Sequence, residues 1–198
     1  MTRADARGVA LGILLARERP SRVVSYDALK SSRDRALALD LVNGTVRWRR
    51  LLLSYVSSFS DRPVEELSPS LRNALLLGAY QLLILGMPPH AAVDSVVRCL
   101  KSRGERAYCN GCLRSISRNL GHVSLPRLRH DPVSYMSERY SYPDWIPSYF
   151  MGKAGVPWAL AMCRQGNRLP SLSLRVNMAK TDSRSLLEQL TQAGYDAV

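Results

Sequence analysis

The 198-residue sequence has no apolar stretch long enough to cross a membrane. Its longest apolar stretch, residues 74–87, has 14 residues and is interrupted by Gln81, whereas a transmembrane helix needs about 20. Residues 9–16, near the amino terminus, are too short and too amphipathic for the apolar core of a secretory signal peptide. These absences predict a cytoplasmic protein with no membrane partner.

Cysteine is scarce, with only four residues, too few for a disulfide framework in a chain of this length. Cys109 and Cys112 have a Cys-x-x-Cys spacing, but a structural zinc site needs about four ligands, and a redox pair normally opens a helix after a strand. Both instead occupy apolar positions inside a predicted helix. We therefore interpret the cysteines, including Cys99 and Cys163, as buried core residues and predict no metal site.

Lysine and acidic residues are also few, which leaves a large excess of arginine. Of 28 basic residues 24 are arginine, and 16 acidic residues leave a formal net charge of +12. The planar guanidinium suits bidentate phosphate contacts and stacking on bases, so a polyanion, most commonly nucleic acid, is the expected partner. Charge alone does not distinguish RNA from DNA or from an acidic membrane, and a GC-rich genome produces the same arginine bias.

Residues 1–122 predict an all-helical bundle of six or seven helices. They carry 19 basic and 10 acidic side chains, a net charge of +9, and their apolar residues recur at helical spacing. Ser68 and Pro69 form a helix start signal, and the helix that follows is apolar enough to be surrounded by the others. His90, after two prolines, could contact RNA or transfer a proton, but we interpret it as fixing the turn into the next helix by a hydrogen bond.

Residues 123–198 predict a different organisation. We expect a linker over 123–137, connecting helices over 138–166 and the start of an incomplete α+β domain over 167–198. Leu172–Asn177 alternates apolar and polar residues, which is typical of a short strand, and Asp182 or Ser183 can cap a following helix. The predicted fold class is mainly α: a helical bundle followed by a linker, extra helices and the opening strand and helix of an α+β domain.

Several motifs in consistent order resemble one family. Residues 34–49 are similar to the D-R-A…L-V-x-G-V-x-R-x-R stretch of NusB-like domains fused to ribosomal RNA methyltransferases. Residues 71–83 resemble that group's L-R-x-x-L-x-L-G-x-Y-Q-L motif, 88–93 its P-P-H-A-A-V motif, and 109–114 its V-N-G-V-L-R motif. Tyr142–Trp145 and Leu172–Asn177 resemble its H-P-x-W and L-x-L-R-V-N stretches. The chain therefore resembles the amino-terminal region of RsmB/Sun-type 16S rRNA (cytosine-5)-methyltransferases.

The resemblance implies an RNA-binding module that positions 16S ribosomal RNA for a catalytic domain. Enzymes of this family use S-adenosylmethionine and a cysteine nucleophile, but neither the glycine-rich cofactor loop nor the Pro-Cys motif occurs in these 198 residues. We expect no catalytic and no cofactor-binding residue in this chain, and no methylation by it alone. The alternatives are a free-standing NusB-like antitermination factor that binds RNA and a ribosomal protein, and a scaffold module that binds protein. The oligomeric state stays open.

The arginines are the candidate functional residues, in three groups. The first lies at the amino terminus, where the family has a basic RNA-binding segment; the second flanks Trp48, which either stacks on a base or fills a helix junction; the third is spaced i, i+4 on the last helix of the bundle. Substituting the first group by alanine is expected to weaken RNA binding without loss of helicity. The predicted RNA-binding residues are Arg3, Arg7, Arg47, Arg49, Arg50, Arg114 and Arg118.

Overall fold

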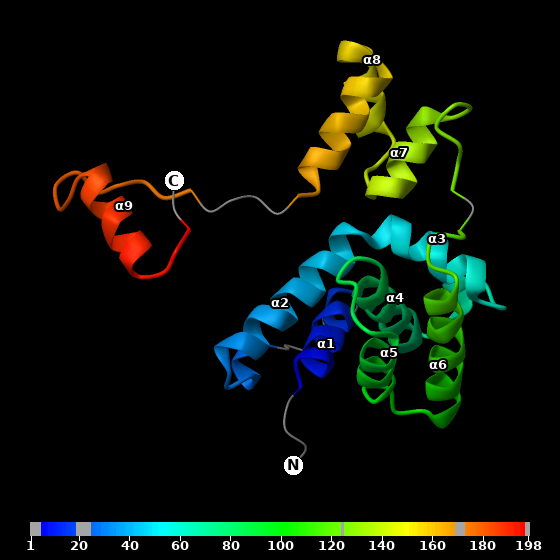
Figure 1. The fold of residues 1–198 in the computed structure, drawn as a ribbon. Helices are drawn as coiled ribbons and strands as arrows, with labels where there is room; N and C mark the ends of the chain where they lie inside the picture. Colours follow the sequence, from blue (N-terminus) through cyan, green and yellow to red (C-terminus); the bar gives the residue numbers. More distant parts are fainter. Residues whose placement is uncertain (1–4, 19–24, 124, 169–172, 197–198) are drawn as a thin grey trace. The chain divides into compact units, whose positions relative to one another are not determined.

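The computed structural model describes residues 5–18, 25–123, 125–168 and 173–196. These residues form helices and connecting segments and contain no β-strand (Figure 1). The chain divides into two compact units, residues 1–166 and 167–198, which are described separately. The helices are α1 (Ala6–Glu18), α2 (Ser32–Arg47), α3 (Arg49–Phe59), α4 (Pro69–Leu83), α5 (Pro89–Val97), α6 (Arg103–Arg118), α7 (Pro132–Tyr140), α8 (Trp145–Gly166) and α9 (Ser183–Gln192), with 3-10 turns at Tyr26–Ala28 and Val64–Glu66.

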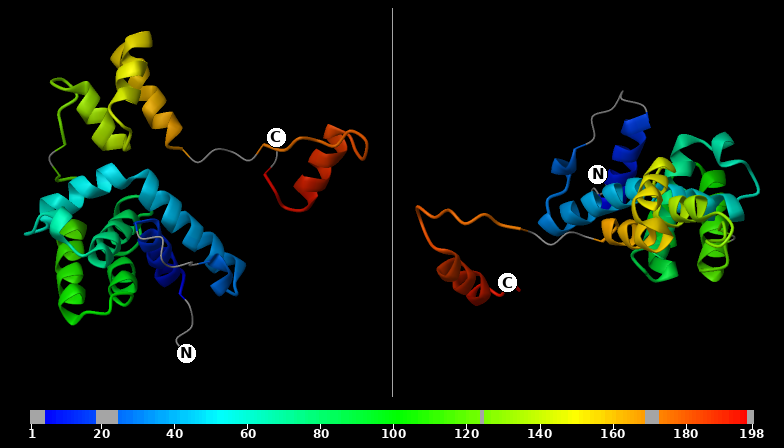
Figure 2. Two further views of the ribbon diagram at one scale, coloured as in Figure 1. Left: turned by 180° about the vertical axis from the view of Figure 1, so that it is seen from behind. Right: turned by 90° about the horizontal axis from the view of Figure 1, so that it is seen from above.

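Helix α4 lies in the middle of the bundle, as its apolar sequence predicts. It contacts α1, α2, α3, α5 and α6 (Figures 1 and 2), and nearly every side chain from Leu71 to Leu82 is buried. The expected start signal is confirmed, because Pro69 is the first helical residue and the Ser68 hydroxyl accepts a hydrogen bond from the Leu71 N–H at 3.2 Å. A helix buried on all sides needs neighbouring side chains packed against its backbone, and two glycines leave room for this packing.

Gly44 in α2 and Gly78 in α4 are points where a neighbouring side chain lies directly against the helix backbone. A Cβ atom on Gly44 would lie 2.0 Å from Cζ of the Tyr80 ring, and one on Gly78 would lie 2.4 Å from a Leu113 methyl group. The Tyr80 hydroxyl also donates a hydrogen bond to Asp40, at 3.3 Å. Three of the motifs that carry the family resemblance thus hold α2, α4 and α6 together by direct packing.

The chain turns sharply between α2 and α3 at Trp48. This residue ends the first helix and precedes the second, and its partly buried ring packs against the main core. The structure therefore has two separate helices here, α2 and α3. The helix-junction interpretation of Trp48 is confirmed, and the core contact argues against a ring held free for a base.

A second pair of helices, α7 and α8, packs on the bundle through α3. The Ser141 hydroxyl accepts a hydrogen bond from the Leu51 N–H at 2.9 Å, which satisfies one of the amide groups left free in the first turn of α3. Ser54 donates to Glu138 at 3.3 Å. Between α7 and α8, the side chains of Met136, Ala159 and Cys163 form a small buried core separate from that of the bundle. The carboxyl-terminal helices of this unit are therefore joined to the bundle by polar contacts along the first half of α3.

The boundaries of these helices differ from the expected ones. Residues 132–137 were expected to belong to a linker but form most of α7, because Asp131 caps the helix by accepting a hydrogen bond from the Ser134 N–H at 2.9 Å and Pro132 opens it. Helix α8 bends where Ala154 and Gly155 leave helical geometry, Gly155 having a φ of +78°. Pro157 begins the second half of the helix, where its missing N–H costs little.

The second unit contains helix α9 and the segment before it. As predicted, Asp182 caps α9 by accepting a hydrogen bond from the Ser185 N–H at 3.0 Å, and Gly194 (φ +84°) follows its end. The strand expected over Leu172–Asn177 is wrong for the described residues 173–177, which belong to no helix or strand. A strand needs a neighbour to pair with, and the described residues contain none. No residue of α9 is buried.

Candidate nucleic-acid interface

Three predicted RNA-binding arginines lie at the junction of α2 and α3. Arg47, in the last turn of α2, is exposed, and Arg49 is half-buried. Arg50, in the first turn of α3, instead contacts the α7–α8 pair. Its guanidinium donates to the Tyr142 carbonyl at 3.1 Å and forms an ion pair with Asp144 at 2.8 Å. Of the three, Arg47 is therefore the best placed for an external phosphate.

Replacing Arg50 by alanine is expected to loosen the α7–α8 pair from the bundle. The substitution removes a charge-assisted hydrogen bond and a half-exposed ion pair, together worth about 1–2 kcal/mol. Amide hydrogen exchange in α7 and in the first turn of α3 should accelerate several-fold, because these segments would open locally. Arg47→Ala is the matched control, because Arg47 is exposed, lies three residues before Arg50 and carries the same charge. Equal effects of the two substitutions would contradict a positioning role for Arg50.

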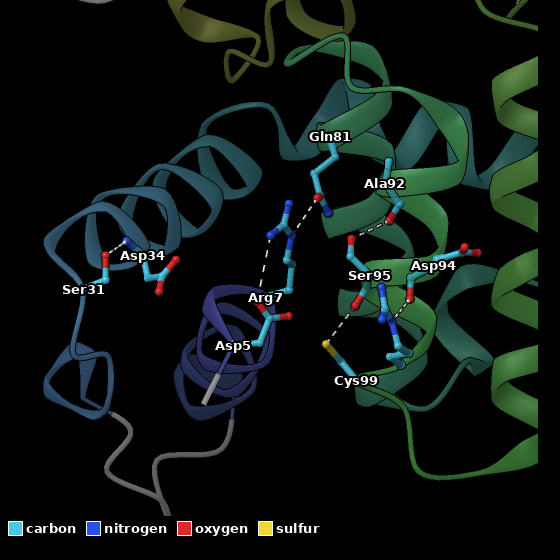
Figure 3. Close-up of polar contacts among 10 residues, drawn as sticks. Asp5, Arg7, Ser31, Asp34, Gln81, Ala92, Asp94, Ser95 and Cys99 are labelled. Atoms are coloured by element: carbon cyan, nitrogen blue, oxygen red, sulfur yellow. Dashed lines mark hydrogen bonds and ion pairs between the residues drawn. The ribbon is translucent and has the colours of Figure 1, made fainter. Parts of the chain in front are cut away.

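Arg7 lies between α1 and α4, where most of its side chain is buried. Its Nε donates to Oε1 of the fully buried Gln81 at 3.3 Å, and its guanidinium lies 3.9 Å from the Asp5 carboxylate (Figure 3). Only 18% of the Arg7 side chain is exposed. This contact gives Arg7 a role in packing α1 on α4. Arg3, the other member of the amino-terminal pair, lies outside the described residues.

Arg114 and Arg118 lie on the exposed side of the carboxyl-terminal half of α6. The Arg114 Nε donates to Asn110 at 3.0 Å, and an Arg118 amino group donates to Ser115 at 3.4 Å. The structure brings both arginines together with His90, because all three line one surface pocket. The sequence interpretation preferred a helix-turn role for His90 over RNA contact. The signal that could have placed His90 beside these arginines is the short connection after α5, which brings the start of α5 next to the end of α6.

The four cysteines are free thiols placed in apolar surroundings. Cys109, Cys112 and Cys163 are buried, and Cys99 is half-buried. Burial raises the thiol pKa to about 12 for Cys109 and to about 11 for Cys112, because the charged thiolate is poorly solvated there. Among the described residues no group of three or more His, Cys, Asp or Glu side chains could hold a metal ion. The interpretation of the Cys109–Cys112 pair as core residues is confirmed.

These raised pKa values predict a loss of stability in alkali. Above about pH 9 the unfolded chain ionises its thiols while the folded chain keeps them protonated, so the free energy of unfolding falls as the pH rises towards the folded-state pKa values of about 11–12. Denaturant unfolding at pH 8, 9 and 10 measures this trend. A Cys109→Ala, Cys112→Ala variant is the control and should show a weaker dependence; an unchanged dependence would assign the effect to other groups.

Among the residues that the structure describes, none of the helices combines the length and the hydrophobicity of a membrane-spanning segment.

Comparisons with known proteins agree with the resemblance found in the motifs. Residues 5–118 match the model of the NusB family, and residues 142–198 match the Methyltr_RsmF/B-like, ferredoxin-like domain. The chain is 33% identical over 168 residues to the ribosomal RNA small subunit methyltransferase B of Pseudomonas syringae pv. tomato, covering 83% of this chain and 36% of the relative. It is 30% identical over 207 residues to the probable ribosomal RNA small subunit methyltransferase B of Bacillus subtilis, covering 99% and 46%.

The chain thus spans less than half the length of these curated relatives. Among solved structures, the crystal structure of PH0851 is similar in fold, with a TM-score of 0.58 at 16% identity over 98% of this chain and 46% of that one. The family match covers the helical bundle, and the second match begins at the α7–α8 connection and continues through α9. The chain belongs to the NusB family and continues into the ferredoxin-like domain found in RsmF/B-like methyltransferases.

Proposed function

We propose that this chain is the RNA-binding amino-terminal portion of a SAM-dependent 16S rRNA (cytosine-5)-methyltransferase. The observation that carries the proposal is that this chain matches two domains in the order expected for RsmB/Sun-type enzymes. Its relatives named ribosomal RNA small subunit methyltransferase B agree with that order. The basic charge supports it, because residues 1–122 contain 19 of the 28 basic side chains. In this proposal the bundle binds ribosomal RNA, and a catalytic domain selects the cytosine.

The exposed arginines favour contacts with RNA phosphates. Arg47, Arg114 and Arg118 are exposed, and guanidinium contacts to phosphates supply affinity and orientation without choosing a base. Arg50 binds residues of the α7–α8 connection and Arg7 binds Gln81 of α4, whereas the hydrogen bonds of Arg114 and Arg118 stay within α6. We therefore assign Arg50 and Arg7 to the positioning of helices. The proposed RNA surface is therefore smaller than the seven arginines predicted from the sequence.

S-adenosylmethionine donates the methyl group in the family that the chain resembles, and the described residues contain no loop that fits this cofactor. Gly152 and Gly155 lie within α8, where Gly155 marks a kink, whereas a cofactor loop of that family joins a strand to a helix. We assign no cofactor contact and no chemical step to this chain. A free-standing antitermination factor is the weaker candidate, because residues 142–198 match a domain of methyltransferases.

Binding of the 198-residue chain to fluorescent fragments of small-subunit rRNA tests this proposal. If about three phosphates are neutralised, the affinity should fall about 20–40-fold between 0.05 and 0.2 M salt, since each contact contributes about 0.7–0.9 to the slope of log K against log salt. Arg47→Ala should reduce that slope by about one contact, and Arg50→Ala should leave it nearly unchanged. Absence of binding at low salt, or an affinity independent of salt, would contradict the proposal.

A further inference from the structure

The pocket between α5 and α6 brings three cationic or ionisable side chains to one place. Its volume is about 330 Å³, and it is lined by Pro89, His90, Val93, Arg114, Ser117 and Arg118. The two helices are antiparallel neighbours (Figures 1 and 2), so the first turn of α5 meets the last turns of α6. Among these lining residues there is no carboxylate that would neutralise the arginines.

Contacts within α6 orient the two guanidinium groups. Arg114 uses its Nε on Asn110 at 3.0 Å, and Arg118 uses one Nη on Ser115 at 3.4 Å. A guanidinium has five N–H donors, so each arginine keeps several for a ligand in the pocket. The spacing of four residues places both side chains on the same side of the helix, and a planar fork matches phosphate oxygens in a bidentate manner.

The other groups that line the pocket offer few additional hydrogen-bond donors to a ligand. The Ala91 and Ala92 N–H groups both donate to the Pro88 carbonyl at 3.0 Å, and Pro89 has no N–H, so the start of α5 offers few free amides. The Ser117 hydroxyl donates to the Arg114 carbonyl at 2.9 Å. Val93, only 1% exposed, provides an apolar wall. The site is therefore made by two arginines, with the His90 imidazole beside them.

We propose that this pocket binds a phosphate group. The same chemistry would accept a phosphodiester of RNA or a small phosphate; we assign the RNA phosphate, and that part of the inference rests on the proposed function. The pocket would fix one point of the RNA on the bundle, at the α5–α6 end. His90 would contact the bound phosphate, and the imidazole of that residue provides a direct signal of occupancy.

Inorganic phosphate and NMR of the histidine side chains test the site without RNA. His90→Gln assigns the His90 signal, and His122 and His130 are internal controls. At constant pH, with ionic strength held by chloride, phosphate should shift the His90 signal with saturation and leave the other two in place. The shift should disappear in an Arg114→Ala, Arg118→Ala variant of unchanged helicity. A non-saturating shift, or one that persists in that variant, would overturn the proposed pocket.

A second experiment measures the affinity of the Arg114→Ala, Arg118→Ala variant for a fluorescent small-subunit rRNA fragment. Affinity should fall about 10-fold or more, and the salt slope should drop by about two contacts, whereas the control Arg33→Ala, Arg35→Ala, two exposed arginines at the start of α2, should cost less than about 3-fold. If phosphate binds but RNA affinity is unchanged, the assignment to RNA is wrong. If the wild-type chain binds phosphate but no RNA, the proposed function fails while the phosphate pocket is supported.

Discussion

Replacing Gly44 by alanine should destabilise the bundle by about 2–3 kcal/mol, although alanine is the better helix former. The new methyl group would lie 2.0 Å from Cζ of Tyr80 and 2.1 Å from its hydroxyl oxygen, far inside the contact distance of real atoms. Tyr80 is only 4% exposed and its hydroxyl donates a hydrogen bond to Asp40, so its ring has little room to move. Relief requires α2 to move away from α4, which opens the core on both sides.

Thermal or urea unfolding of the 198-residue chain measures the effect. Gly111→Ala is the matched control, because Gly111 also lies inside a helix, α6, but a Cβ atom there would meet nothing within 4 Å. Its substitution should stabilise the chain by about 0.5–1 kcal/mol through helix propensity alone. The two identical changes should thus have opposite signs.

A second background identifies the clashing group. In a Tyr80→Leu chain the ring is absent, so Gly44→Ala should cost at least 1 kcal/mol less than it does in the wild type, a coupling expected for residues in contact. An equal cost in both backgrounds, or a stabilised Gly44→Ala single variant, would show that α2 and α4 do not approach as described.

Periodicity and capping residues predicted most of the bundle from the sequence. The apolar residues from Leu71 to Leu82 predicted a helix surrounded by others, and Ser68 with Pro69 predicted its start. These signals are local, so each can be recognised without knowledge of the fold. The close approaches at Gly44 and Gly78 depend on which helices are neighbours, and only the tertiary structure specifies that.

The strand prediction is wrong over residues 173–177 for a physical reason that a local pattern does not contain, whereas the linker prediction is wrong only over residues 132–137, where a local signal was present. Residues 173–177 alternate as a strand does, but a strand is stable only when a neighbour satisfies its backbone groups, and none is present among the described residues. The linker interpretation rested on the composition before Pro132, whereas Asp131 and Pro132 form a good helix start. In that case the capping signal was present in the sequence and was outweighed by composition.

The arginines show the same limit at the candidate site. Sequence spacing grouped Arg47, Arg49 and Arg50, but Arg50 finds its partners Tyr142 and Asp144 about 90 positions along the chain. Conversely, Arg114 and Arg118 gain His90 as a neighbour because α5 and α6 are antiparallel. Long-range partners decide whether a basic side chain is available to RNA, and charge counts carry no information about them.

Replacing Arg7 by methionine should destabilise the chain by about 1–3 kcal/mol. Methionine keeps an apolar stem that can fill part of the space, but the Oε1 atom of the buried Gln81 loses the donor at 3.3 Å (Figure 3). A buried acceptor without a partner incurs the desolvation penalty of that group. The loss should appear in urea unfolding as a lower midpoint with an unchanged slope.

Removing both partners separates this role from RNA contact. In an Arg7→Met, Gln81→Leu chain no polar atom of the pair remains buried, so stability should recover towards the wild-type value, because replacing both partners by apolar groups of similar size is often nearly neutral. If Arg7 acts by holding α1 on α4, this double variant should bind ribosomal RNA within about 3-fold of the wild type. A restored stability together with a 10-fold loss of RNA affinity would instead make Arg7 a phosphate contact, as the sequence first predicted.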